Sequence, residues 1–125
     1  MMNYISTKNA PAPSGHYSQA VVHNGLVYIS GQLPVNPGMD EKYVGTIEAQ
    51  TLQTLKNLEA ILTEAGSNLE KVIKTTVYVA DIGLWDRVNT IYSDFFKDHK
   101  PARAVVPTKE LHFGFQIEIE AIASV

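Results

Sequence analysis

The chain has 125 residues, of which 45% are hydrophobic and 18% charged, a composition typical of one soluble globular domain that we expect to span residues 1–125. Its formal net charge of −3 disfavours a nucleic-acid partner, because proteins that bind phosphate backbones usually carry an excess of basic residues. The absence of cysteine excludes disulfides, a thiolate nucleophile and a cysteine-bound zinc. No apolar run fits a signal peptide or a membrane span, so we expect a cytoplasmic protein with no membrane partner.

The first third of the chain predicts three short β-strands. Residues 4–6 fit a first strand, and residues 10–15, which contain two prolines and a glycine, predict a loop. β-type runs at residues 19–22 and 26–31 flank Asn24-Gly25, and Asn-Gly is the strongest short signal for a hairpin. We therefore expect a β-hairpin here, followed by a loop.

Residues 46–66 carry the pattern of an amphipathic helix. Thr46 is a candidate N-cap, and Glu48 would lie near the positive end of the helix dipole. Gly66 is typical of the position that follows a helix C-terminus. The helix is expected to have about five turns. Its apolar residues at helical spacing are Leu52, Leu55, Leu58, Ile61, Leu62 and Ala65.

The next two elements are predicted to be a strand and a second helix. Alternation over residues 71–80 predicts a strand. One face of this strand would carry Ile73, Thr75, Val77 and Val79. A helix at about residues 84–97 ends before Pro101, which cannot continue it. Its apolar side would consist of Leu84, Val88, Ile91 and Phe95.

Two further strands are expected at residues 102–106 and 115–123, with a turn between them at residues 110–114. In the last strand, one face would be apolar and the other would carry two carboxylates. The apolar face consists of Ile117, Ile119, Ala121 and Ala123, and the other face of Glu118, Glu120 and Ile122.

The expected order of elements is β-β-β-α-β-α-β-β, which favours an α+β sandwich with both helices on one face of a sheet of five or six strands. A strand that joins a parallel neighbour through a helix needs a right-handed crossover, so part of the sheet should be parallel. The opposite face would be polar, covered either by water or by an oligomer interface. Its residues would be Lys74, Thr76, Tyr78, Glu118 and Glu120.

Arg103 is a charged residue within an otherwise apolar strand. Such a residue is often an edge residue whose stem packs while its charged group reaches water. The functional alternative is a clamp for a substrate carboxylate, because a guanidinium offers a planar fork that matches two carboxylate oxygens. The residues alone leave both interpretations open.

Glu118 and Glu120 point the same way from one strand, roughly 6.5–7 Å apart. They suit a general acid/base pair, or else they form a solvated face or pair with basic residues of a neighbouring strand. Tyr17 lies at a loop-to-strand junction, and Ser30-Gly31 near a strand end, where glycine allows close approach of a ligand or marks a bulge. The four histidines form no metal-binding motif, and no glycine-rich nucleotide motif occurs.

Seven segments together give the chain a resemblance to a known family over essentially its whole length. They are Thr7-Lys-Asn-Ala-Pro11, Tyr17-Ser-Gln-Ala20, Ser30-Gly-Gln-Leu-Pro34, Ala65-Gly66, Val88-Asn89, Pro101-Ala-Arg103 and Ile117-Glu-Ile-Glu-Ala-Ile-Ala123. In their order and spacing they resemble the RidA (YjgF) family of imine deaminases. The resemblance implies a chorismate-mutase-like fold and a homotrimer with ligand sites between subunits.

The resemblance also implies a reaction and a set of roles. The substrate would be a 2-imino acid or its enamine tautomer, hydrolysed to a keto acid and ammonia without a metal or an organic cofactor. By similarity, Arg103 holds the substrate carboxylate and Glu118 positions or activates the hydrolytic water, with Glu120 as the alternative glutamate. The remaining pocket positions would be Tyr17, Ser30, Gly31 and Asn89.

Three departures from the family pattern bear on substrate range rather than on the reaction. His16 stands where proline is usual, and Val105 where cysteine is common. The segment Leu111-His112-Phe113-Gly114 replaces the common Leu-Pro-Lys and is expected to reshape the pocket rim.

Three functional hypotheses follow. The leading one is deamination of 2-aminoacrylate, 2-iminopropionate or 2-iminobutyrate. The second is a regulatory protein that binds a small carboxylate without catalysis. The third, RNA cleavage or translation inhibition, is disfavoured by the net charge of −3.

Overall fold

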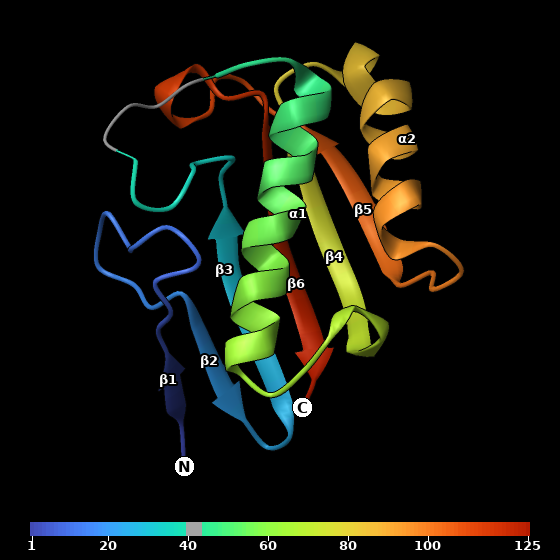
Figure 1. Cartoon of the computed structure of the whole chain (residues 1–125). Helices are drawn as coiled ribbons and strands as arrows, with labels where there is room; N and C mark the ends of the chain where they lie inside the picture. The colour runs from blue at the N-terminus through green and yellow to red at the C-terminus, as the bar shows by residue number, and fades with distance from the viewer. Residues whose placement is uncertain (40–43) are drawn as a thin grey trace.

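A single mixed sheet organises the protein. The computed structural model describes residues 1–39 and 44–125. Six strands are ordered β1-β2-β3-β6-β4-β5 across the sheet, and only the β4–β5 pair is parallel within the described chain (Figure 1). The strands are β1 (Asn3–Ile5), β2 (Ala20–His23), β3 (Leu26–Gln32), β4 (Val72–Val79), β5 (Ala102–Pro107) and β6 (Ile117–Ser124).

Two helices, α1 (Ile47–Glu64) and α2 (Trp85–Phe96), lie on the same face of the sheet (Figure 1). The chain also forms three short 3-10 helices: η1 (Leu69–Lys71), η2 (Ile82–Leu84) and η3 (His112–Gly114). Helix α2 connects the two parallel strands. The expected α+β class, the order of elements and the placement of both helices on one sheet face are therefore confirmed.

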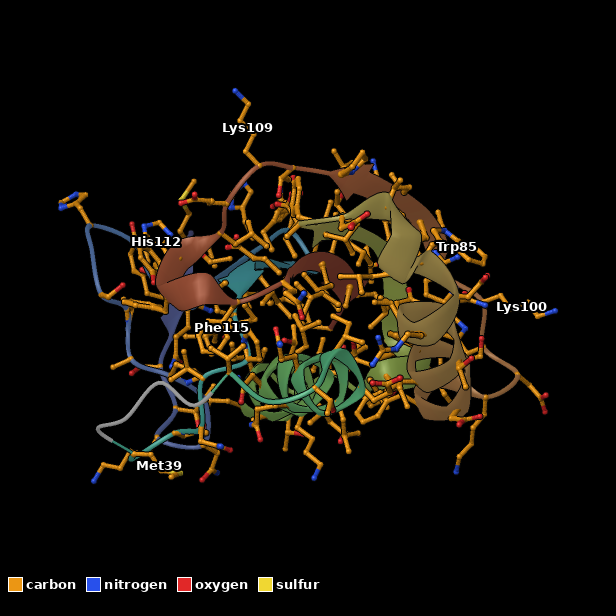
Figure 2. All side chains as sticks on the ribbon, turned by 90° about the horizontal axis from the view of Figure 1, so that it is seen from above. Met39, Trp85, Lys100, Lys109, His112 and Phe115 are labelled. Atoms are coloured by element: carbon orange, nitrogen blue, oxygen red, sulfur yellow. The ribbon has the colours of Figure 1, made fainter. Side chains whose placement is uncertain are left out.

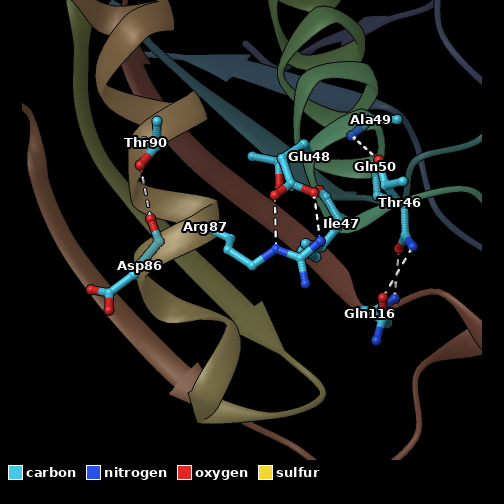
Figure 3. Close-up of polar contacts among 10 residues, drawn as sticks. Thr46, Ile47, Glu48, Ala49, Gln50, Asp86, Arg87, Thr90 and Gln116 are labelled. Carbon is cyan, nitrogen blue, oxygen red and sulfur yellow. Dashed lines mark hydrogen bonds and ion pairs between the residues drawn. The ribbon is translucent and has the colours of Figure 1, made fainter.

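The start of α1 is tied to its surroundings by polar contacts (Figure 3). The Thr46 hydroxyl accepts a hydrogen bond from the Ala49 backbone N–H at 3.1 Å, which confirms the predicted N-cap. The side-chain oxygen Oε1 of Gln50 accepts a hydrogen bond from the Gln116 backbone N–H at 2.8 Å, which joins α1 to the segment before β6. An exposed pair between Glu48 and Arg87, with Nε–Oε2 at 2.7 Å, links α1 to α2.

The core lies between the helices and the sheet. It contains Leu55, Leu58, Ile61 and Leu62 of α1 and Ile117, Ile119 and Ala123 of β6, as the periodicity predicts. Leu52 differs from the prediction, because its side chain is 38% exposed. Thr51 and Thr54 are fully buried on α1 instead, and Thr51 donates its hydroxyl proton to the Ile47 carbonyl at 2.8 Å.

The prediction for one residue of β4 is wrong. The alternation predicts that Ile73 shares a face with Thr75, Val77 and Val79, but these three are buried whereas Ile73 is 48% exposed, and Val72 is buried in its place. The pairing of β4 with β6 shifts register between Val72 and Lys74. A bulge inserts one residue into the alternation, and this places Ile73 on the outer face.

The buried side of α2 is rotated from the predicted one. Val88, Tyr92 and Phe96 are buried, while Leu84, Ile91 and Phe95 are only partly buried beside them. The rings of Tyr92 and Phe96 lie 4.7 Å apart, and the Tyr92 hydroxyl is 2.7 Å from the Thr75 hydroxyl of β4. The aromatic rings therefore take the central positions that the simple apolar pattern assigned to Ile91 and Phe95.

The sheet face opposite the helices is polar, as expected. No helix within residues 1–39 and 44–125 packs over its centre, where Tyr78 of β4 donates its hydroxyl proton to the Glu120 carboxylate. Glu118, Glu120 and Thr76 on this face are partly buried, and Lys74 is exposed. This face and the helix-covered face each carry one part of the candidate site.

Candidate functional site

Arg103 is held in place by α2. It lies in β5 opposite Thr75, a buried residue of β4, so its side chain points to the helix-covered side of the sheet. Its Nη1 donates to Asn89 Oδ1 at 2.9 Å, and its guanidinium carbon lies 4.7 Å from the centre of the Tyr92 ring and 5.5 Å from that of Trp85. These contacts orient the guanidinium before any ligand arrives.

The Arg103 charge remains available to a ligand. Among the described residues, the sole salt bridge joins Glu48 to Arg87, so Arg103 has no carboxylate partner there. The side chain borders a cleft of about 410 Å³ that Asn89, Tyr92 and Ser93 also line. Arg103 is on an edge strand, as one of the two interpretations expected, but its guanidinium is fixed rather than freely solvated.

Glu118 lines a second cleft, of about 270 Å³, on the opposite side of the sheet. Tyr17, Ser30 and Gly31 line it too, together with His112 and Phe113 of η3. The Ser30 hydroxyl donates to the Ser18 carbonyl at 2.6 Å, and the Tyr17 hydroxyl accepts from the Ser14 backbone N–H at 3.3 Å. Hydroxyl oxygens and one carboxylate thus face a shared space.

Gly31 allows Glu118 to sit against the backbone of β3. A methyl group at Gly31 would overlap a Glu118 carboxylate oxygen and lie 3.0 Å from the carboxyl carbon. The pairing of β3 with β6 also shifts register between Ile29 and Gln32. Gly31 therefore lies at the strand irregularity that was one of its two predicted purposes, and the group that approaches it closely is the Glu118 carboxylate.

The environment of Glu118 favours its neutral form. Burial raises the pKa of the Glu118 carboxyl above its usual value, the His112 imidazolium opposes that rise, and the negative charge of Glu120 adds to it. A carboxyl with a raised pKa is suited to take up and return a proton during a reaction. Glu120 instead borders a different cleft with Lys74 and Thr76, and the Tyr78 hydroxyl binds it.

Within one chain the predicted site residues form two separate groups. Asn89 and Arg103 lie on the helix-covered side, and Tyr17, Ser30, Gly31 and Glu118 border the cleft on the polar side. The separation follows from register, because Arg103 pairs with Thr75 whereas Glu118 pairs with Tyr78. Thr75 and Tyr78 are an odd number of residues apart on β4 and so face opposite sides.

Two contributors to these groups were not predicted. Trp85, at the start of α2, provides one of the two rings near Arg103 (Figure 2 labels it). Gln19 is 2% exposed, and its side-chain amide donates to the carbonyls of Thr7, Ala10 and Pro11 while its oxygen accepts from the Thr7 N–H. Gln19 thereby anchors the loop that leads to Tyr17. Gln19 lies within the family segment Tyr17-Ser-Gln-Ala20, which could have pointed to it, whereas Trp85 lies in none of the seven segments.

No set of three or more histidine, aspartate or glutamate side chains in residues 1–39 and 44–125 lies close enough together to hold a metal ion. In the same part of the chain, no helix is both long and apolar enough to cross a bilayer.

Comparison with known proteins places the chain in a family. A model of the family described as "Endoribonuclease L-PSP" matches residues 7–125. The chain is 46% identical over 124 residues to a RutC family protein of Aquifex aeolicus, with 98% of each chain covered. It is 44% identical over 119 residues to the human 2-iminobutanoate/2-iminopropanoate deaminase, with 95% of this chain and 87% of the human protein covered.

The chain belongs to the RidA (YjgF) family. A Rid family protein from Yersinia pestis, YyfA, has the same fold, with a TM-score of 0.96, 44% identity and complete coverage of both chains. Membership in the RidA family and its fold, both expected from the motifs, are therefore confirmed. The roles of individual residues in the RidA-like site remain predictions.

Proposed function

We propose that this protein is a deaminase that hydrolyses 2-imino acids and their enamine tautomers to 2-keto acids and ammonia, with 2-aminoacrylate, 2-iminopropionate and 2-iminobutyrate as substrates. The observation that carries the proposal is an oriented guanidinium at Arg103 that has no acidic partner within residues 1–39 and 44–125, together with a carboxyl of raised pKa at Glu118. The 44% identity to the human deaminase supports the same reaction.

Arg103 would bind the substrate carboxylate. Asn89 occupies one nitrogen of the guanidinium, and an arginine has five N–H donors, so enough remain for two bonds to a carboxylate. Because the rings of Tyr92 and Trp85 already orient the group, binding costs little side-chain entropy. A fixed carboxylate in turn fixes the position of the neighbouring imine carbon.

Glu118 would act on water. In the first step the water oxygen bonds to the carbon of the protonated imine, one water proton passes to Glu118, and the carbon–nitrogen π electrons move to nitrogen, which carries two protons. In the second step Glu118 returns its proton to that nitrogen, which then carries three. The carbon–nitrogen bond breaks with its electron pair on nitrogen, ammonia leaves, and the hydroxyl becomes the keto oxygen as its proton passes to the Glu118 carboxylate and from there to water. A raised pKa lets Glu118 serve in both directions.

We further propose that the complete site forms between subunits of a homotrimer. Arg103 and Asn89 of one subunit would meet the cleft of a neighbour that contains Glu118, Tyr17 and Ser30. Two observations support this: the two groups face opposite sides of one sheet, and the polar face has no helix over its centre in the described chain. We place the activity in the cytoplasm, with a small imino acid as the partner molecule.

A coupled assay tests the reaction. A threonine dehydratase generates 2-iminobutyrate in the assay mixture. Semicarbazide reacts with this imine to form a semicarbazone, in competition with hydrolysis by the protein. The wild-type protein should suppress semicarbazone formation, whereas Arg103→Ala should not. Lys109→Ala is a matched control, because it removes a cation that projects away from the protein (Figure 2).

Two results would redirect the proposal. If no precursor amino acid gives suppression while a keto acid binds in an Arg103-dependent manner, the protein is a carboxylate-binding regulator. If the protein binds RNA and the affinity falls steeply with salt concentration, the nucleic-acid hypothesis becomes the favoured one despite the net charge of −3.

A further inference from the structure

An apolar cleft of about 350 Å³ adjoins the cleft that contains Glu118. Within residues 1–39 and 44–125, no aspartate, glutamate, lysine, arginine or histidine lines this apolar cleft. Its walls consist mainly of Pro11, Ala12, Leu33, Val35, Pro37 and Met39. The residues that line both clefts are Ser14, Tyr17, Gly31, Leu33 and Phe113. A molecule bound beside Glu118 can therefore extend from a polar space into an apolar one.

Buried amide side chains fix the walls of the apolar cleft. The side-chain amide of Asn57, a fully buried residue of α1, donates to the carbonyls of Leu33 at 3.0 Å and Val35 at 2.9 Å. The buried Gln19 donates to the Pro11 carbonyl at 2.9 Å. Because hydrogen bonds hold the backbone that carries these apolar side chains, the cleft is formed before a ligand arrives, and little further ordering is needed on binding.

Phe113 lies where the two clefts meet. Its backbone has φ 62° and ψ 18°, a left-handed conformation that is unfavourable for an aromatic residue and that is concentrated at functional sites. Its ring lies edge-on to that of Phe115, with the ring centres 6.1 Å apart, and Phe115 is 1% exposed. The turn thus presents a large apolar side chain, 48% exposed, at the junction of the clefts.

We propose that the apolar cleft binds the side chain of the substrate, so that the protein prefers 2-imino acids with branched or long apolar side chains over 2-iminopropionate and 2-iminobutyrate. Phe113 packs against the side chain where it enters. Val35, which lines the apolar cleft but not the Glu118 cleft, limits its length. The kinetic consequence rests on the proposed function, whereas the binding of an apolar side chain does not.

The chemistry of the substrate leads to the same assignment. The imine carbon bears three substituents: a carboxylate, a nitrogen and the side chain. In the proposed site Arg103 of a neighbouring subunit holds the carboxylate, and Glu118 exchanges protons with the water and the nitrogen. The side chain is the substituent that remains, and the apolar cleft continues from the space beside Glu118.

The hydrophobic effect sets the size of the preference. A methyl or ethyl group fills only a small part of a cleft of about 350 Å³. The isobutyl group of the leucine-derived imino acid has three more carbons than the methyl group of 2-iminopropionate. Each buried methylene strengthens binding by about fourfold, so three carbons correspond to at most about 60-fold. Ordering of the side chain reduces this gain, and we expect a preference of about 10- to 60-fold.

The kinetic test compares the leucine- and alanine-derived imines, which an L-amino acid oxidase generates in the presence of catalase, with semicarbazide as the competitor. The wild-type kcat/KM should be about 10- to 60-fold higher for the leucine-derived imine. Val35→Phe fills the cleft, and Phe113→Gly removes the ring at a positive φ that suits glycine, so each should reduce this ratio to below about fivefold. Leu52→Phe enlarges an exposed residue of α1 outside both clefts and should keep the wild-type ratio. A wild-type ratio near one, with turnover of both imines, would overturn the inference and leave the proposed function intact.

A second measurement does not depend on catalysis. The keto acids 4-methyl-2-oxopentanoate and pyruvate share the carboxylate and differ in the side chain, and titration calorimetry gives the Kd of each. The wild-type protein should bind 4-methyl-2-oxopentanoate about tenfold more tightly or better, and Val35→Phe should remove the difference. If this holds while no imine is hydrolysed, the proposed function fails and the apolar subsite stands. If wild type binds both equally, or if the difference persists in Val35→Phe and Phe113→Gly, the subsite proposal is wrong.

Discussion

At the scale of single residues, the contact between Gly31 and Glu118 matters most. The carboxylate occupies the space that any side chain at Gly31 would need, and a flexible glutamate can move away from an added methyl group. The geometry of the cleft is therefore more sensitive to this substitution than the fold is.

Gly31→Ala should lower kcat/KM by about 10²-fold or more, the range that a misplaced general base costs. The free energy of unfolding should change by less than about 1 kcal/mol, because only the end of the Glu118 side chain is displaced. Imine hydrolysis and urea denaturation check the two parts. Gly15→Ala is a control, since a methyl group there would meet only ordinary contacts with the Tyr17 ring, at 3.6 Å or more. Full activity in Gly31→Ala would show that the position of Glu118 is unimportant.

At the scale of elements, a buried amide holds the N-terminal loop to the sheet. Gln19 directly precedes β2, and its side chain forms hydrogen bonds with the backbone of Thr7, Ala10 and Pro11. Ala10 is buried, with only 3% of its surface exposed. Loops carry buried carbonyls only where a partner satisfies them. Gln19 thus links a core position to the loop from which Tyr17 projects into the Glu118 cleft.

Gln19→Met should lower the free energy of unfolding by about 2–4 kcal/mol, because it leaves several backbone groups without partners at an unchanged side-chain volume. Urea denaturation measures the change. Gln53→Met is the matched control, since the Gln53 amide makes a single bond, to Asn57 Oδ1 at 2.9 Å, and should cost about 0.5–1.5 kcal/mol. Equal effects of the two substitutions would contradict the anchoring role of Gln19.

At the scale of the whole molecule, the two groups of site residues lie on opposite sides of one sheet, and we propose that they meet across a subunit interface. A ring of identical subunits would join the Arg103 side of each chain to the Glu118 side of the next. Such an arrangement makes a distinctive prediction for mixtures of inactive variants.

Co-expressed Arg103→Ala and Glu118→Gln chains should regain activity, although each variant alone is inactive. A ring of three that contains both variants has one neighbouring pair in which both residues are intact, whichever variant is present twice, so about a third of the sites are complete. Activity per chain should therefore reach about a third of the wild-type value, measured on trimers purified through two different tags. Purified mixed trimers without any recovery would show that one chain contributes both residues.

The sequence by itself determined the elements whose signals are local. The Asn24-Gly25 pair has positive φ angles at both residues, 51° and 78°. It closes the predicted hairpin between β2 and β3, because a two-residue turn that fits the twist of the strands requires positive φ at both positions. Thr46 caps α1, and alternation in β6 buries Ile117 and Ile119 while it turns Glu118 outward. The seven motifs, in their order and spacing, also identified the RidA family, because the residues that define a family pattern can be read directly in the sequence.

Only the tertiary structure decided features that depend on neighbours far along the chain. The bulge that exposes Ile73 arises from pairing between β4 and β6, and the rotation of α2 follows from the bond between Tyr92 and Thr75. The same holds for the site. The register of β5 and β6 against β4 places Arg103 and Glu118 on opposite sides of the sheet, and pairing between strands distant in sequence has no local signal that could reveal it.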